Sequence, residues 1–190
     1  WWKRAGAQGH VRALHNIGLA YIGNGKQDYT EALRYLRQAA ERGFANSQYS
    51  LGKMFHYGLG VEEDAAQAAV QFRLAAQQGF VKAAYNLGKA YRDGDGVDAD
   101  DAQSAHWFRV AAEGGYAKAQ RHLARRVGRG QGVTKDEVEA LKWAILSSQQ
   151  GVADAAVLRD FLMESLSPAD VAQAESMADR FKAEARNSAW

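Results

Sequence analysis

Four glycines recur at a constant interval along the chain, and this interval limits the possible folds more than any other feature of the sequence. Gly43, Gly79, Gly115 and Gly151 are each separated from the next by 36 residues. Self-similarity at a period of about 20 to 50 residues is typical of repeat architectures, in which one supersecondary unit stacks on the next. The sequence therefore predicts a repeat protein, and its 190 residues suffice for a short array.

Each period contains the signals of two helices joined by a Gly-x-Gly turn. The first, helix A, carries apolar or small residues at helical spacing, as in Ala83, Leu87 and Tyr91. The second, helix B, follows an aspartate with Glu or Gln three residues later, which predicts a capping box with reciprocal side-chain bonds. Helix B ends at the periodic glycine, which suits a left-handed C′ position before an apolar residue. The predicted capping residues are Asp28, Asp64, Asp100 and Asp136.

The same signals divide the chain into six segments. The first nine residues align with 107–115, so we expect them to be helix B of an incomplete preceding repeat. Ser167, Pro168 and Asp170 predict the start of a last helix, whose apolar stripe closes the open end of the stack. The predicted segments are 1–9, repeat 1 at 10–43, repeat 2 at 44–79, repeat 3 at 80–115, repeat 4 at 116–151, and a degenerate helix with a capping helix at 152–190.

The composition favours helices and excludes disulfides and cysteine metal sites. The chain has one proline, Pro168, and no cysteine, so proline interrupts no helix interior and neither disulfides nor thiolate metal sites can form. No apolar run approaches the ~18 residues that indicate a transmembrane helix. The five histidines show no H-E-x-x-H pattern, and neither a G-x-S-x-G motif nor a Walker loop occurs. The sequence therefore predicts no catalytic residue, no cofactor and no metal ion.

The acidic stretch "RDGDGVDADD" at 92–101 raises the question of a calcium loop. The calcium pattern needs Asp or Asn at the fifth position and glycine at the sixth, where this stretch has Val97 and Asp98. We interpret it as a turn between helices. We expect Asp93, Asp95 and Asp98 to lie on the outer side of the protein.

The repeats resemble the SEL-one-like repeats (SLR), a subfamily of the tetratricopeptide-like repeats. The stretch "AYNLGKAYRDGDGVDADDAQSAHWFRVAAEGG" at 84–115 follows the family pattern A-x-x-x-L-G-x-x-Y-x-x-G-x-G-V-x-x-D-x-x-x-A-x-x-W-x-x-x-A-A-x-x-G. Repeat 4 departs from it, because Ala124 replaces the glycine and Val127 the tyrosine. The resemblance covers about residues 1–151. It implies an all-α, right-handed α-solenoid of antiparallel helix pairs that binds other proteins without catalysis, often in bacterial signalling or envelope assembly.

In tetratricopeptide-like solenoids helix A lines the concave surface, and the resemblance extends this geometry to the present chain. The four predicted helix A segments carry nine basic residues and no acidic one, although the chain has 22 acidic residues. We therefore expect a basic concave groove that binds an acidic peptide or helix of another protein. The predicted partner-binding residues are Arg12, His15, Asn46, Tyr49, Lys53, His56, Lys82, Tyr85, Lys89, Arg92, Lys118, Arg121 and Arg125.

Several alternatives remain open. The basic residues can be ordinary solvated helix faces, with the acids drawn to helix N-termini by the helix dipole. The chain can also be a structural or assembly subunit of a larger bacterial envelope complex, docked through its ends or convex face. An enzyme is a more distant alternative, as is an RNA-binding protein suggested by Arg121, Arg125, Arg126 and Arg129. The periplasm is slightly favoured over the cytoplasm, and any targeting segment would lie upstream of Trp1.

Overall fold

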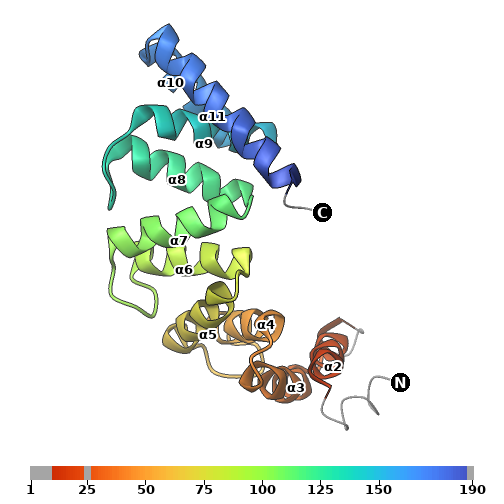
Figure 1. Cartoon of the computed structure of the whole chain (residues 1–190). Helices are drawn as coiled ribbons and strands as arrows, with labels where there is room; N and C mark the ends of the chain where they lie inside the picture. Colours follow the sequence, from red (N-terminus) through yellow and green to blue (C-terminus); the bar gives the residue numbers. More distant parts are fainter. Residues whose placement is uncertain (1–9, 24–26, 188–190) are drawn as a thin grey trace. The chain divides into compact units, whose positions relative to one another are not determined.

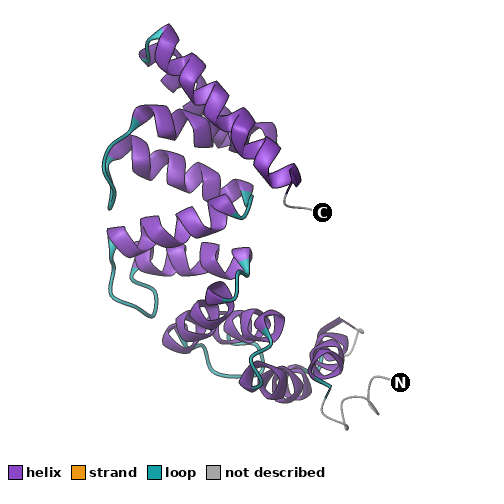
Figure 2. Ribbon diagram, viewed as in Figure 1, coloured by secondary structure: helices purple, strands orange, loops and turns teal. Residues whose placement is uncertain are grey.

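The computed structural model describes residues 10–23 and 27–187, and every regular element within them is an α-helix (Figure 1, Figure 2). Short loops connect successive helices. The helix predicted at 1–9 lies outside the described residues. The helices are α2 (Val11–Gly23), α3 (Tyr29–Glu41), α4 (Ala45–His56), α5 (Ala65–Gln77), α6 (Val81–Asp93), α7 (Asp101–Glu113), α8 (Ala117–Arg129), α9 (Glu137–Gln149), α10 (Ala153–Ser165) and α11 (Pro168–Asn187).

The chain divides into two compact units, which we describe separately. Unit 1 spans Trp1–Ala99 and contains α2 to α6, whereas unit 2 spans Asp100–Trp190 and contains α7 to α11. In unit 1, each helix packs on the next in chain order. In unit 2, α8 packs on α7 and α9, while α10 and α11 both pack on α9. The boundary falls inside repeat 3, between its two helices.

Each helix B begins at the predicted aspartate. Asp64 Oδ1 accepts a hydrogen bond from the Gln67 backbone N–H at 2.9 Å. The reciprocal half of the predicted capping box is wrong, because the Asp64 backbone N–H donates to the Phe55 carbonyl of the preceding helix A at 3.0 Å. The capping residue therefore ties helix B to the helix A of its own repeat. The first bond recurs at Asp28, Asp100 and Asp136, and the second at Asp28 and Asp136.

Each helix B ends at the periodic glycine, as the sequence predicts. Gly79 has a φ of 82°, its N–H donates to Ala76 O at 2.9 Å, and the Phe80 N–H donates to Ala75 O at 3.1 Å. These two bonds form a Schellman motif, which satisfies carbonyls at the helix end. Phe80 is also the N-cap of α6, so one residue ends helix B and begins the next helix A. The equivalent glycines Gly43, Gly115 and Gly151 have φ values of 81°, 81° and 84°.

The two helices of a repeat approach each other closely because helix A carries a glycine beneath a large side chain of helix B. A Cβ atom on Gly52 would lie 2.7 Å from the Phe72 ring, and one on Gly18 would lie 2.6 Å from Leu36 Cγ. Phe72 and Leu36 are both buried. The glycine of the family pattern therefore makes room for a core side chain.

Repeat 4 departs from this pattern, and its departure is compensated within the same helix pair. Ala124 takes the place of the glycine, and Ala144 takes the place of Leu36 and Phe72. Both alanines are fully buried. Helix A has gained a methyl group where helix B has lost a large side chain, so the close contact that requires a glycine in repeats 1 and 2 does not arise here.

The second glycine of the Gly-x-Gly turn packs on the preceding repeat. A Cβ atom on Gly96 would lie 2.1 Å from the carbonyl carbon of Ala65, and one on Gly132 would lie 2.0 Å from Asp101 O. Ala65 and Asp101 are the first residues of α5 and α7. The sequence predicted these glycines only as turn residues. The structure adds that the missing Cβ lets the turn contact the backbone of the preceding helix B.

The C-terminal helix α11 begins and packs as predicted. The Asp170 backbone N–H donates to Ser167 Oγ at 3.2 Å, directly before the first helical residue Pro168. Ala174 and Ala178 are fully buried, and α11 lies against α9 (Figure 1). The Phe181 ring meets the buried Trp143 ring edge-on, with centroids 5.3 Å apart. The apolar stripe of α11 therefore covers the last complete helix pair.

Candidate partner-binding site

An open cavity of about 360 Å³ lies between α4, α5 and α6, and we call it the unit 1 groove. The Tyr49 ring packs against Phe72 and Phe80, with ring centroids 6.0 and 4.7 Å apart. Rigid aromatic contacts of this kind give the groove a fixed apolar part. The polar lining residues are Tyr49, Lys53, His56, Tyr57, Asn86, Lys89, Asp93 and Asp95, and the apolar ones are Ala65, Ala68, Ala69, Phe72 and Ala90.

The unit 1 groove carries both signs of charge. Lys53 and Lys89 have no ion-pair partner among the residues that the structure describes. Asp93 and Asp95 line the same groove, so the expectation that they lie on the outer side is wrong. His56 Nδ1 lies 3.4 Å from Asp95 Oδ2. The two lysines are therefore the cations of this groove that remain available to a ligand.

The structure brings four of the predicted partner-binding residues of unit 1 into the groove and leaves six outside it. Those that line it are Tyr49, Lys53, His56 and Lys89. Arg12, Asn46 and Lys82 are exposed near the starts of their helices, and Tyr85 is partly buried. Of the last two, His15 is buried, whereas Arg92 is exposed but paired with an adjacent carboxylate.

His15 lies inside the packing of unit 1 instead of on a groove surface. Its side chain is 8% exposed, Nδ1 lies 2.9 Å from Ser47 Oγ, and the ring meets Phe44 edge-on. Burial lowers the pKa of the His15 imidazole. His15 therefore joins α2 to α4 and is too buried to contact a partner.

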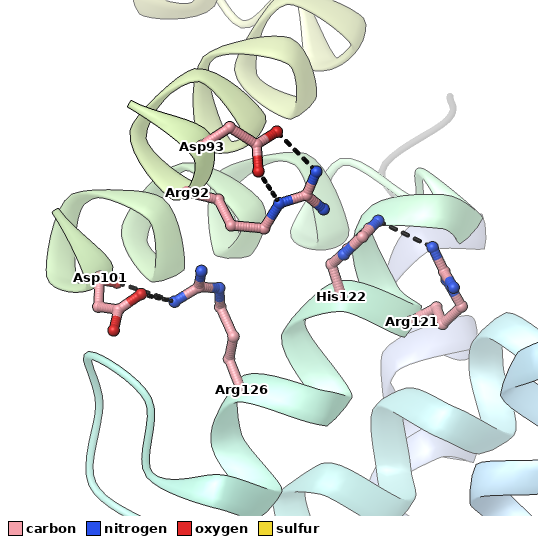
Figure 3. Close-up of polar contacts among 6 residues, drawn as sticks. All are labelled: Arg92, Asp93, Asp101, Arg121, His122 and Arg126. Carbon is pink, nitrogen blue, oxygen red and sulfur yellow. Dashed lines mark hydrogen bonds and ion pairs between the residues drawn. The ribbon is translucent and has the colours of Figure 1, made fainter. Parts of the chain in front are cut away.

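Arg92 is already paired with its neighbour. Its Nε and Nη2 atoms each donate to the Asp93 carboxylate at 2.7 Å (Figure 3). This hydrogen-bonded carboxylate raises the pKa of the Arg92 guanidinium. The sequence predicts Arg92 as a partner-binding residue, but the adjacent Asp93 carboxylate already balances its charge.

A second open cavity, of about 530 Å³, lies between α8, α9 and α10, and we call it the unit 2 groove. It occupies the position in repeat 4 that the unit 1 groove occupies in repeat 2, two 36-residue periods earlier. Of the residues predicted in α8, only Arg125 lines it. Its lining residues are Ala124, Arg125, Gly128, Arg129, Glu137, Asp154, Val157, Leu158, Phe161 and Leu162.

The other two predicted residues of α8 do not line the unit 2 groove. Arg121 Nη1 donates to Asp154 Oδ2 at 2.8 Å, and its Nη2 lies 2.9 Å from His122 Nε2 (Figure 3). Lys118 is exposed near the start of the helix. Arg125 is therefore the one predicted residue of α8 in the groove, beside Arg129, which was not predicted as a partner-binding residue.

Sequence reasoning missed the apolar wall of the unit 2 groove. Val157 and Phe161 on α10 are 72% and 64% exposed. They stand two periods after Tyr85 and Lys89, at the helix A positions that the sequence analysis assigned to the concave surface. The sequence predicts 152–166 only as a degenerate helix, and the repeat spacing applied to this helix identifies both residues.

The arginine run of α8 is divided among different environments. Arg126 is buried, its Nη1 donates to Asp101 Oδ1 at 2.8 Å (Figure 3), and its guanidinium lies 5.8 Å from the Phe108 ring centroid. It therefore joins α8 to α7 inside unit 2. With Arg121 also paired, the run does not form the continuous basic surface that phosphate contacts require.

Two further features concern the kinds of site that the described part of the chain can form. Residues 10–23 and 27–187 contain no cluster of three or more His, Asp or Glu side chains suited to a metal ion. None of the helices placed by the structure combines the length and apolarity needed to cross a membrane. The two grooves are the candidate sites because predicted partner-binding residues line both of them.

A protein-family model, the Sel1 repeat, matches residues 11–44, 45–80, 81–116 and 117–152. Each match starts one residue after the corresponding repeat boundary that we predicted. A curated F-box protein of Arabidopsis thaliana is 33% identical over 57 residues, which is 30% of this chain and 16% of the plant protein. The sequence likeness to that protein is thus confined to a small part of it.

Two solved structures resemble most of the chain. One is a protective antigen present in uropathogenic Escherichia coli strains and displaying an SLR fold, with 30% identity, a TM-score of 0.82, and coverage of 95% of this chain and 39% of the antigen. The other is a Sel1 repeat protein from Oxalobacter formigenes, with 32% identity, a TM-score of 0.79, and coverage of 85% and 48%. The chain thus spans less than half the length of these relatives.

Proposed function

Because the chain belongs to the Sel1 repeat family, an all-α solenoid family of generally protein-binding and typically non-catalytic scaffolds, we propose that it is an adaptor that binds an acidic segment of another protein. The observation that carries this proposal is the unit 1 groove, in which Lys53 and Lys89 line one cavity without described ion-pair partners. The role of an assembly subunit docked through its ends or convex face, and the periplasmic location, stay predictions.

The lining of the unit 1 groove supports an acidic, extended ligand. Lys53 comes from α4 and Lys89 from α6, so a segment that lies between these helices meets a cation from each. Tyr49 supplies a large contact area that loses little conformational entropy on binding. Asp93 is paired with Arg92, and Asp95 lies 3.4 Å from His56 Nδ1, so the two lysines are the charges left for an acidic ligand.

The exposure of Lys53 indicates a weak, salt-dependent interaction. Exposed ion pairs contribute about 0.2 to 1 kcal/mol each, so two lysines alone support modest affinity and mainly accelerate association. The Debye length falls from about 10 Å at 0.1 M salt to about 3 Å at 1 M salt. We therefore expect affinity to decrease steadily as salt is raised over this range.

A peptide array in which Glu content varies independently of length tests the proposal, with affinities of the best peptides measured by fluorescence anisotropy. We expect Lys53→Glu and Lys89→Glu each to weaken binding about fivefold, equivalent to about 1 kcal/mol. Arg180→Glu, which reverses an exposed charge on α11 outside both grooves, is the matched control. If the lysine variants bound the peptides as tightly as wild type, the unit 1 groove would not be the binding site. Binding that did not change with salt would lead to the same conclusion.

A further inference from the structure

The unit 2 groove has the same place in its repeat as the unit 1 groove but a different chemistry. Its α8 wall carries Arg125 at the position of Lys53, whereas its α10 wall carries Val157 and Phe161 at the positions of Tyr85 and Lys89. One wall therefore offers positive charge and the facing wall offers apolar surface.

The apolar wall belongs to a helix that is already anchored by other residues. Ala155 is fully buried and Leu162 is 4% exposed, while Val157 and Phe161 project outward one helical turn apart. Because the Val157 and Phe161 side chains are mostly exposed, they are not part of the core of unit 2. Exposed apolar surface grouped in a groove is the usual mark of a binding site for a protein segment.

The charges of the groove select the chemistry of the ligand. Its two acidic residues already have partners, because Glu137 lies 2.7 Å from Lys135 Nζ and Asp154 lies 2.8 Å from Arg121 Nη1. Arg125 and Arg129 have no ion-pair partner among the residues described in unit 2. The arginines are therefore the charges left for a ligand, and they attract carboxylates.

We propose that the unit 2 groove binds an amphipathic acidic segment of a partner protein. An apolar side chain of the segment packs on Val157 and Phe161, and neighbouring carboxylates lie opposite Arg125 and Arg129. The cavity of about 530 Å³ lies within the range of roughly 300 to 1,000 Å³ that is usual for ligand pockets, so it has room for a large apolar side chain. This ligand differs from that of the unit 1 groove in needing an apolar anchor as well as charge.

The test uses the full chain and a peptide array in which Glu content and the placement of Leu or Phe vary independently. We expect the best peptides to contain both, and to lose about tenfold in affinity when the anchor is changed to Ser or the Glu residues to Gln. On the protein, Phe161→Ser and Arg125→Glu should each weaken binding by a similar factor. The exposure of both side chains allows these variants to fold, and circular dichroism checks this.

Two matched variants make the experiment specific. Met163→Ser removes another exposed apolar side chain of α10 that lines no part of this groove, and it should bind the peptides like wild type. Lys53→Glu should also leave their binding unchanged, so failure in one groove is distinguishable from failure in the other. Phe161→Ser binding as tightly as wild type, or no anchor-dependent peptide binding at all, would overturn the proposal.

A second copy of the chain is the competing occupant of this apolar wall. Sedimentation velocity over a range of protein concentrations distinguishes the two occupants. We expect that the chain does not self-associate through this wall, so wild type and Phe161→Ser should sediment alike at every concentration. Self-association that Phe161→Ser does abolish would assign the groove to a contact between copies and overturn the proposal.

Discussion

The unit 1 and unit 2 grooves are built from equivalent helices, yet they present different surfaces. In unit 1 the groove carries Lys53, Lys89 and the Tyr49 ring, together with two aspartates. In unit 2 the equivalent space has arginines on one wall and the exposed Val157 and Phe161 on the other. The helix caps and glycine contacts that hold the helices in place recur in both units.

This difference shows that the side chains that distinguish the two grooves are separate from the glycine contacts and helix caps, which we call the framework. The framework depends on backbone conformation and on the absence of side-chain atoms, as at Gly96 and Gly132. The charged side chains of both grooves and the exposed Phe161 take no part in these contacts, whereas Ala65 and Phe72 line the unit 1 groove and also lie at the glycine contacts. Substitutions in the two classes should therefore have separable effects on stability and on binding.

Gly132→Ala and Gly96→Ala should have the largest effects, one in each unit. The new Cβ would lie 2.0 Å from Asp101 O or 2.1 Å from the Ala65 carbonyl carbon, and the backbone at each glycine has a φ of 72°. We expect each to reduce the free energy of unfolding of its own unit by about 3 kcal/mol or more. Hydrogen–deuterium exchange resolved by unit measures this loss.

Gly115→Ala is the matched control for these substitutions. Gly115 has a φ of 81°, but a Cβ atom there would meet nothing within 4 Å. Only the left-handed conformation is then penalised, by about 1 to 2 kcal/mol. If Gly132→Ala cost no more than Gly115→Ala, the close approach between turn and helix would not determine the stacking.

The helix pair of repeat 2 can be changed toward that of repeat 4. Gly52→Ala should cost about 1 to 3 kcal/mol by overpacking against the Phe72 ring. Phe72→Ala alone should cost about 3 to 5 kcal/mol by leaving a cavity. The double variant reproduces the Ala124 and Ala144 pair, so we expect it to cost less than the sum by at least about 1 kcal/mol.

Urea unfolding of the two single variants and the double variant measures this coupling. Additive losses would show that the alanine pair of repeat 4 does not compensate the volume at this helix contact.

The helix B caps should contribute equally in the two units. Asp64→Ala and Asp136→Ala each remove a side-chain oxygen that accepts an N–H of the first helical turn, at 2.9 and 2.8 Å. Each should cost about 1 kcal/mol. Thermal unfolding and hydrogen–deuterium exchange resolved by unit measure both losses of stability. Clearly different losses for Asp64→Ala and Asp136→Ala would contradict a common framework.

Acid should destabilise the two units in different pH ranges, with the smallest expected effects. Burial lowers the pKa of His15 below its ordinary value of 6.5. As the pH falls, the imidazole of the unfolded chain therefore binds a proton before that of the folded chain does. Unit 1 therefore loses stability as the pH falls below 6.5. His15→Gln should remove this loss, whereas His106→Gln, at an exposed position, should not. Urea unfolding at a series of pH values measures both.

Unit 2 has its own acid-sensitive pair at lower pH. Burial alone would raise the pKa of Glu139, but hydrogen bonds from Arg109 and Trp143 lower it below its ordinary value of 4.5. Its contribution is therefore complete above pH 4.5 and is lost as the pH falls through the lowered folded-state pKa. Glu139→Gln should reduce this loss, and an unchanged acid transition in that variant would contradict the assignment.

The framework was predictable from the sequence because its signals are local. The aspartate before helix B and the glycine after it act within a few residues, so Asp64 and Gly79 were placed correctly. Helical spacing likewise identified the buried stripe of α11. The assignment of the concave residues came from the family resemblance and remains a prediction for the residues that line the grooves.

The missed features depend on contacts between distant residues. His15 is buried by Ser47, which lies 32 positions away, and nothing in the local sequence indicates this. Asp93 and Asp95 line the unit 1 groove because α6 and the following turn lie beside α4. The close approach of Gly132 to Asp101 also requires the stacking of one repeat on another.

The shared corner residue between repeats has a consequence for how such a chain can change in length. Phe80 both completes the Schellman motif of α5 and precedes the first residue of α6. Inserting or deleting one residue there would rotate the next helix by about 100° around its axis, since a helix has about 3.6 residues per turn. Duplication or loss of a whole 36-residue cassette preserves this register, so a binding groove can be gained or lost intact in a single genetic event.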